Sequence, residues 1–200
     1  MNVYERIFKL WSSICKMIVD GVRDPEKVAD ALQVIVDEVV VKNYLRRLEV
    51  VRLGATDSTE TYETAKKVFE AGFDSDFENF GIIFSGIAPE MDVAVDELVK
   101  NGKFREFLGE TLEELERRRM LGSQFVKFCR DIPGKLKQGG NASFFVLTKN
   151  DEPVAVDLSN VFVASVLVNG GGQLDSYVNP FDRGNTWYAE CRHRILYPQR

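Results

Sequence analysis

Segments that favour β-strands follow one another closely in the last third of the chain. They read "SFFVLTK", "EPVAVDLS", "VFVASVLVN", "QLDSYVN" and "TWYAECRHRIL", and they are rich in β-branched and aromatic residues. Short stretches with turn composition separate them, among them Asn150-Asp151 and "NGGGQ". Such short turns leave no room for crossover helices, so the pattern predicts an antiparallel β-meander of four to five strands in residues 139–200.

Helical signals dominate the chain before residue 139. Apolar residues recur at helical spacing from Val3 to Ile18, and Asp24-Pro25 is a typical helix start. Further helices are predicted in "STETYETAKKVFEAGF" after a cap at Ser58 or Thr59, over Glu90–Lys100, through "KFREFLGETLEELERRR", and in "SQFVKFCRDI" with Ser123 as cap. A short strand is predicted at residues 48–53. The predicted fold is α+β: a helical N-terminal two-thirds, residues 1–138, packed with the C-terminal meander, as two domains or one integrated domain.

The composition of the chain disfavours several classes of protein. The chain has 200 residues, 44% of them hydrophobic, which is enough for a core that needs no metal or disulfide. A net charge of −5 disfavours non-specific binding to DNA or acidic lipid. No stretch approaches the ~20 apolar residues of a membrane span, and charges interrupt the N-terminal segment, so we expect a cytoplasmic protein without a membrane partner. The cysteines Cys15, Cys129 and Cys191 form no C-x-x-C pair, which predicts free thiols.

The segment "TWYAECRHRILYP" contains the only histidine, His193. If the segment is one strand, its side chains alternate between two faces. His193 then lies on an apolar, inward face, which is typical of a neutral core histidine. Tyr188, Glu190, Arg192 and Arg194 share the outward face, where a ladder of ion pairs is the simplest interpretation.

Two functions are compatible with this outward face. Aromatic and arginine side chains are enriched at binding hot spots, so Tyr188, Arg192 and Arg194 predict a non-catalytic module that binds another macromolecule, in the first place a protein. The alternative is an RNA-binding protein or a phosphodiesterase-type nuclease. In the nuclease, His193 would be the acid or base, Glu190 its complement, and Arg192 or Arg194 would stabilise phosphate charge. The face assignment favours the binding module over the enzyme.

Acidic residues alternate with aromatic residues in "FDSDFENFG". Asp74, Asp76 and Glu78 are a candidate magnesium site, although an EF-hand loop would need glycine at Asn79 and glutamate at Ser85. The alternative is a loop anchored by its phenylalanines, with the acids in water. No phosphate-binding glycine loop, zinc-ligand spacing or hydrolase motif occurs, so no cofactor and no metal is predicted.

Four stretches resemble a set of uncharacterised bacterial proteins from small-genome lineages. They are "RDPEKVADALQVIVDE", "GATDSTETYETAKKVFEAGFDSDFENFG", "FVKFCRD" and "TWYAECRHRILYPQ". The resemblance implies a bacterial or phage-borne protein and carries no activity with it. Where that set often has a histidine and a tryptophan after "FCRD", this chain has "IPGKL".

Overall fold

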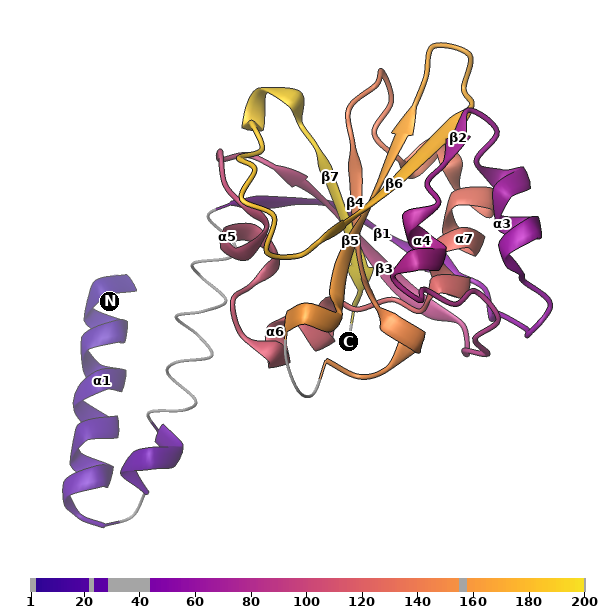
Figure 1. Cartoon of the computed structure of the whole chain (residues 1–200). Coiled ribbons are helices and arrows are strands. Elements are labelled where there is room, and N and C mark those ends of the chain that lie inside the picture. Colours follow the sequence, from indigo (N-terminus) through magenta and orange to yellow (C-terminus); the bar gives the residue numbers. More distant parts are fainter. Residues whose placement is uncertain (1–2, 22–23, 29–43, 155–157, 200) are drawn as a thin grey trace. The chain divides into compact units, whose positions relative to one another are not determined.

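The computed structural model describes residues 3–21, 24–28, 44–154 and 158–199. The chain divides into two compact units, Met1–Val40 and Val41–Arg200 (Figure 1). In the first unit, the predicted opening helix is α1, Val3–Val19, and it ends before Gly21, whose φ is +68°. Residues 25–28 are helical, and Asp24 accepts a 3.0 Å hydrogen bond from the backbone N–H of Glu26. The rest of that predicted helix lies outside the described residues.

The second unit is built on one mixed sheet of seven strands in the order β1-β3-β7-β4-β5-β6-β2. The strands are β1 (Leu45–Leu53), β2 (Gly72–Phe73), β3 (Met91–Leu98), β4 (Ser143–Thr148), β5 (Val161–Val168), β6 (Leu174–Pro180) and β7 (Arg194–Pro198). β7 runs parallel to β4 and β2 runs parallel to β6, whereas the other neighbours are antiparallel.

This sheet corrects the predicted architecture. Helices and strands are both present, as expected, but the prediction of a helical N-terminal two-thirds beside a separate C-terminal meander is wrong. β1, β2 and β3 come from residues before 139 and belong to the same sheet as the later strands. Only β4, β5 and β6 form the predicted antiparallel meander; a five-residue turn joins β5 to β6, whereas residues 149–160 join β4 to β5.

Helices cover both faces of the sheet in the second unit (Figure 1). On one face, α3 (Tyr62–Val68), α4 (Asp76–Asn79) and α7 (Gly122–Asp131) pack their apolar side chains around Phe145 of β4. On the other face, α5 (Phe104–Leu108) and α6 (Leu112–Arg118) pack around Phe144. Successive strand residues point to opposite faces, so the adjacent Phe144 and Phe145 supply both cores.

Two predicted helices take another form. Residues 90–100 were expected to be helical behind Pro89, but Met91–Leu98 is strand β3, with both faces buried. A strand buried on both faces lacks the alternation that distinguishes strands in sequence. The single helix predicted through "KFREFLGETLEELERRR" is split into α5 and α6 at Gly109. Its φ of +108° is one that glycine adopts readily and other residues rarely adopt.

The other local expectations have mixed outcomes. The predicted strand at 48–53 is present and begins earlier, at Leu45. The α3 helix is capped by Thr61, not by Ser58 or Thr59, and Ser123 lies within α7 instead of capping it. "EPVAVDLS" contributes no strand within its described residues.

The last connection of the chain determines where a site can form. β6 and β7 lie on opposite sides of the β4–β5 pair in the sheet order. The segment 181–193 therefore crosses the sheet on the α5 side, where Phe181 and Trp187 pack into the same apolar cluster as Phe144. Within the described part of the chain, no helix is both long and apolar enough to span a membrane.

Candidate functional site

A pocket of about 410 Å³ opens between the crossing segment 181–193 and the sheet. This volume lies within the range of about 300–1,000 Å³ that is usual for small-molecule sites. Its lining comes from five parts of the chain: Asp74 and Asp76, Gly140 to Ala142, Ser165 and Leu167 of β5, Tyr177 to Asn179 of β6, and Arg183, Trp187 and His193.

The register of the strands explains the hollow. Ser165 of β5 is paired with Phe144 of β4 on one side and with Tyr177 of β6 on the other. Side chains of directly paired residues lie on the same face, about 4.5–5.5 Å apart at their Cβ atoms. A small side chain between two rings therefore leaves space above β5, and the ring of Tyr177 borders that space.

Trp187 forms the wall opposite the sheet and is held there by its backbone. Its N–H donates to Gly102 O at 2.8 Å and its C=O accepts from Gly102 N at 3.0 Å. The indole packs edge-on against Phe144, with ring centroids 4.6 Å apart, and lies 5.4 Å from Phe104. These contacts make the indole a fixed element of the pocket.

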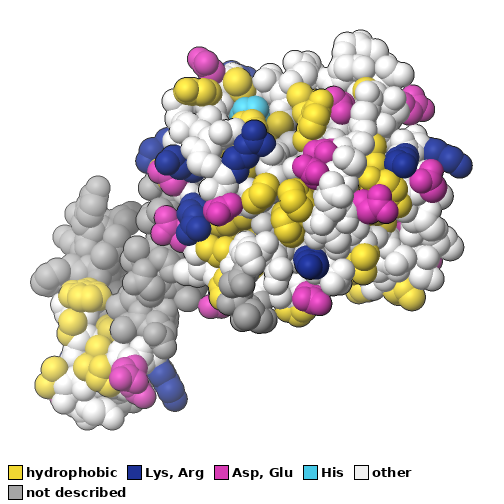
Figure 2. All heavy atoms as spheres, in the orientation of Figure 1, with side chains coloured by type: hydrophobic (Ala, Val, Ile, Leu, Met, Phe, Trp, Pro, Cys, Tyr) yellow, Lys and Arg dark blue, Asp and Glu magenta, His cyan; other side chains and the backbone are white. Residues whose placement is uncertain are grey.

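His193 is part of the pocket lining and is 6% exposed. Its Nδ1 lies 3.2 Å from the N–H of Ala142 and 3.3 Å from the C=O of the same residue. In the neutral tautomer whose Nδ1 accepts the N–H, the proton is on Nε2. Burial lowers the pKa of His193 and outweighs the opposing backbone contact with Ala142, and Lys137 lowers it further. The ring is therefore neutral at pH 7. Figure 2 shows that the histidine still reaches the surface, beside hydrophobic and basic side chains.

Two buried donors of the pocket lining have no hydrogen-bond partner among the described residues. They are the Oγ of Ser165, a residue 4% exposed, and the Nε1 of Trp187. A buried polar group left unpaired costs about 1–3 kcal/mol, so such groups are uncommon in native proteins. Both residues line the pocket. With His193 Nε2–H, they give it a set of hydrogen-bond donors.

The other rim of the pocket is acidic. Asp74 Oδ1 accepts the backbone N–H of Asp76 at 3.0 Å and Oδ2 accepts that of Val178 at 3.3 Å, so this carboxylate fixes the loop to β6. Asp76 Oδ1 accepts from the amide of Asn79 at 2.9 Å. The second oxygen of Asp76 receives no hydrogen bond from the described residues. Arg183, which also lines the pocket, contacts Asn179 of β6.

The structure places the predicted site residues differently from one continuous strand. Residues 189–191 form a 3₁₀ turn, Arg192 has a left-handed φ of 50°, and β7 begins only at Arg194. The alternation predicted for "TWYAECRHRIL" is therefore wrong. Tyr188 is 52% exposed, but Arg194 donates to the backbone carbonyls of Lys135 and Leu136 and so is tied to the protein itself.

The nuclease constellation is not assembled by these contacts. Glu190 and Arg192 are exposed, whereas His193 is buried. Among the described residues, no side-chain hydrogen bond or ion pair joins His193 to Glu190, Arg192 or Arg194. The assignment of catalytic and partner-binding roles to these residues stays a prediction.

The candidate magnesium loop is also divided. Asp74 and Asp76 line the pocket, whereas Glu78 is exposed on α4. In the part of the chain that the structure describes, no group of three or more His, Cys, Asp or Glu side chains is arranged to hold a metal ion.

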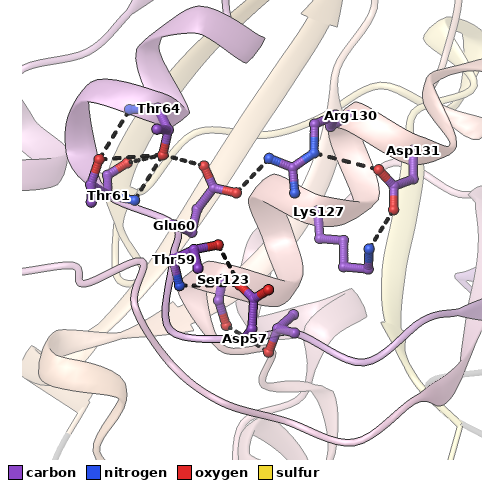
Figure 3. A network of polar contacts seen from close by, with 10 residues as sticks. Asp57, Thr59, Glu60, Thr61, Thr64, Ser123, Lys127, Arg130 and Asp131 are labelled. Carbon is purple, nitrogen blue, oxygen red and sulfur yellow. Dashed lines mark hydrogen bonds and ion pairs between the residues drawn. The ribbon is translucent and has the colours of Figure 1, made fainter.

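A second, polar hollow of about 100 Å³ lies beside α7 (Figure 3). Its cations are engaged within the protein. Lys127 Nζ lies 2.6 Å from Asp131 Oδ2, and Arg130 Nη1 lies 2.5 Å from Glu60 Oε2. Ser123 Oγ donates to Thr56 at 3.3 Å. We interpret this network as a structural tie between α7 and the segment that leads into α3.

Comparison with protein-family models, with curated proteins and with solved structures gives no match for this chain. The function of the site is therefore inferred from its own geometry. Sequence reasoning found His193, Asp74 and Asp76 but not Ser165, Tyr177 or Trp187 as site residues. A serine within the apolar run "VFVASVLVN" is the one sequence signal that could have directed attention to Ser165.

Proposed function

We propose that the chain is a non-catalytic cytoplasmic binding protein whose pocket holds a planar ring with carbonyl acceptors, the nucleobase of a free nucleotide or of single-stranded RNA. The observation that carries the proposal is the pair of unpaired buried donors, Ser165 Oγ and Trp187 Nε1, in an aromatic-walled pocket. Ring carbonyls would satisfy these donors, and Tyr177 offers a face for stacking, which contributes about 1–3 kcal/mol per base.

A binding role is favoured over catalysis by the contacts of the histidine, since its neutral state alone would also suit a general base. Its Nδ1 is engaged by Ala142, and burial keeps the ring neutral through a lowered pKa. A general base also needs an oriented partner, and a nucleophile within hydrogen-bond reach. Neutral His193 Nε2–H is better suited to donate a hydrogen bond to a ligand.

The pocket also favours a nucleobase over a protein partner. The predicted protein-binding face required Tyr188, Arg192 and Arg194 on one strand, and Arg194 is engaged with backbone carbonyls. The concave site has instead the size of a nucleotide pocket and its typical mixture of rings and a few polar groups. Binding of a protein through Tyr188 and Arg192 stays a prediction.

The test is a titration of the whole chain with mononucleotides and, separately, with short single-stranded oligoribonucleotides, followed by calorimetry. Ser165→Ala is expected to weaken binding about tenfold, since a donor to a ring carbonyl is lost. Ser176→Ala is the matched control, because Ser176 Oγ is also buried and has no hydrogen-bond partner among the described residues. Ser176 lies on the same face of β6 as Leu174 and Val178, which is the face of the sheet opposite the pocket. We expect it to bind as the wild type does.

Trp187→Phe retains a ring but removes the indole N–H and should also weaken binding, whereas Trp11→Phe in α1 should not. The mononucleotide and oligonucleotide titrations distinguish a free nucleotide from RNA as the source of the base. Absence of binding to both ligands would refute the proposal. Cleavage of RNA by the wild type, lost in His193→Ala, would replace it with the nuclease alternative.

A further inference from the structure

The two rims of the pocket differ in chemistry. Donors come from the sheet and the crossing segment, at Ser165, Trp187 and His193. Carboxylate acceptors come from the other rim, at Asp74 and Asp76. A ligand that fits both rims must carry acceptors on one part of its ring and donors on another.

The two carboxylates are not equivalent. Both oxygens of Asp74 accept backbone N–H groups, so Asp74 holds the loop and the β6 edge together. Asp76 uses one oxygen for Asn79 Nδ2 at 2.9 Å. Among the described contacts, the other oxygen of Asp76 accepts no hydrogen bond. It is therefore the carboxylate oxygen of this rim that can accept one from a ligand.

From these contacts we infer, on the basis of the proposed function, that the base is guanine and that Asp76 accepts its N–H groups. Guanine combines a ring carbonyl and N7 as acceptors with an adjacent ring N–H and an exocyclic amine as donors. Ser165, Trp187 and His193 suit the acceptors, and the Asp76 carboxylate suits the donors. Adenine lacks the carbonyl, and uracil lacks the amine.

The amine of guanine gives the inference its sharpest test, because inosine monophosphate differs from guanosine monophosphate by this group alone. A good pair of hydrogen bonds to a base discriminates by about 1–3 kcal/mol, which is about fivefold to a hundredfold in affinity. Wild-type protein is therefore expected to bind guanosine monophosphate about tenfold or more tightly than inosine monophosphate or adenosine monophosphate in calorimetry.

Asp76→Asn tests the residue assigned to this preference. The amide retains the shape and the contact with Asn79 but replaces a charged acceptor, so the preference for guanosine over inosine monophosphate should fall to about twofold or less. Glu78→Gln makes the same change of charge two residues away, on an exposed side chain outside the pocket lining, and should keep the full preference.

Each outcome has a distinct meaning. Equal affinity for the three nucleotides overturns the guanine inference and leaves ring binding standing. A preference that survives in Asp76→Asn, in a variant whose circular dichroism matches that of the wild type, overturns the role of Asp76. Absence of binding to every nucleotide refutes the proposed function, and the inference with it.

Discussion

Gly122, the first residue of α7, offers a quantitative test of how tightly this helix is seated. An added Cβ would lie 2.0 Å from the backbone oxygen of Ile83 and 3.1 Å from Cδ1 of Phe84. Alanine in place of glycine favours a helix by up to about 1 kcal/mol. Here a backbone carbonyl blocks the methyl group and cannot rotate away as a side chain could, so α7 or the Ile83 segment must move.

Forced shifts of this kind cost about 1–3 kcal/mol and occasionally more. We therefore expect Gly122→Ala to lower the free energy of unfolding by about 2 kcal/mol. With a urea slope of roughly 2 kcal/mol per molar, the midpoint of unfolding should fall by about 1 M. Gly134→Ala is the control, because an added Cβ there meets no atom within 4 Å. Its free energy of unfolding should be unchanged within ~0.5 kcal/mol. Equal midpoints for Gly122→Ala and wild type would refute the argument.

Two further predictions concern titrating groups. As the sole histidine, His193 gives one imidazole set in an NMR titration, and its pKa should lie below the ordinary ~6.5 because burial disfavours the imidazolium. The free energy of unfolding should then decrease as the pH falls below the pKa that His193 has in the unfolded chain. A measured pKa of His193 at or above the ordinary ~6.5 would contradict the burial argument. Asp151 behaves in the opposite sense. Burial raises the pKa of its carboxyl and outweighs the hydrogen bond from the Gly122 N–H and the charge of Arg119, which both lower it. Ionisation of Asp151 therefore destabilises the fold as the pH rises through that pKa. Asp151→Asn, which keeps an oxygen for Gly122 N–H at 2.9 Å, should raise the free energy of unfolding at pH 7 by about 1 kcal/mol, and the gain should shrink at acidic pH; a loss at pH 7 would contradict this.

The strands β4 and β5 could be predicted because each is a run of β-branched and aromatic residues, and β6 because the turn "NGGGQ" precedes it. The strand β3 and the neighbours of β7 could not be predicted. β3 has no alternation to reveal it, and Pro89 with Glu90 resembles a helix start. Pairing of β7 with β4 and β3 is non-local, and nothing in a run of residues specifies a strand neighbour so distant in sequence.

Only part of the candidate site could be predicted, because its other parts depend on backbone contacts that are distant in sequence. His193 was expected to be inside, and it is buried, although the strand that was to place it begins one residue later. The left-handed Arg192 interrupts the period of two, and a single residue of this kind leaves no mark on the polar and apolar pattern. Trp187 becomes a pocket wall through its backbone pairing with Gly102, a contact that sequence spacing does not reveal.

The sheet order has a consequence for how the molecule comes together during synthesis. β3 and β4 are not neighbours; the last strand in the sequence lies between them and hydrogen-bonds to both. Before its arrival, the growing polypeptide has two partial sheets whose inner edges are open to pairing with another nascent chain. Closure of the sheet must therefore await the synthesis of β7, and a chaperone that shields those edges until then would raise the yield of native protein more than one acting earlier.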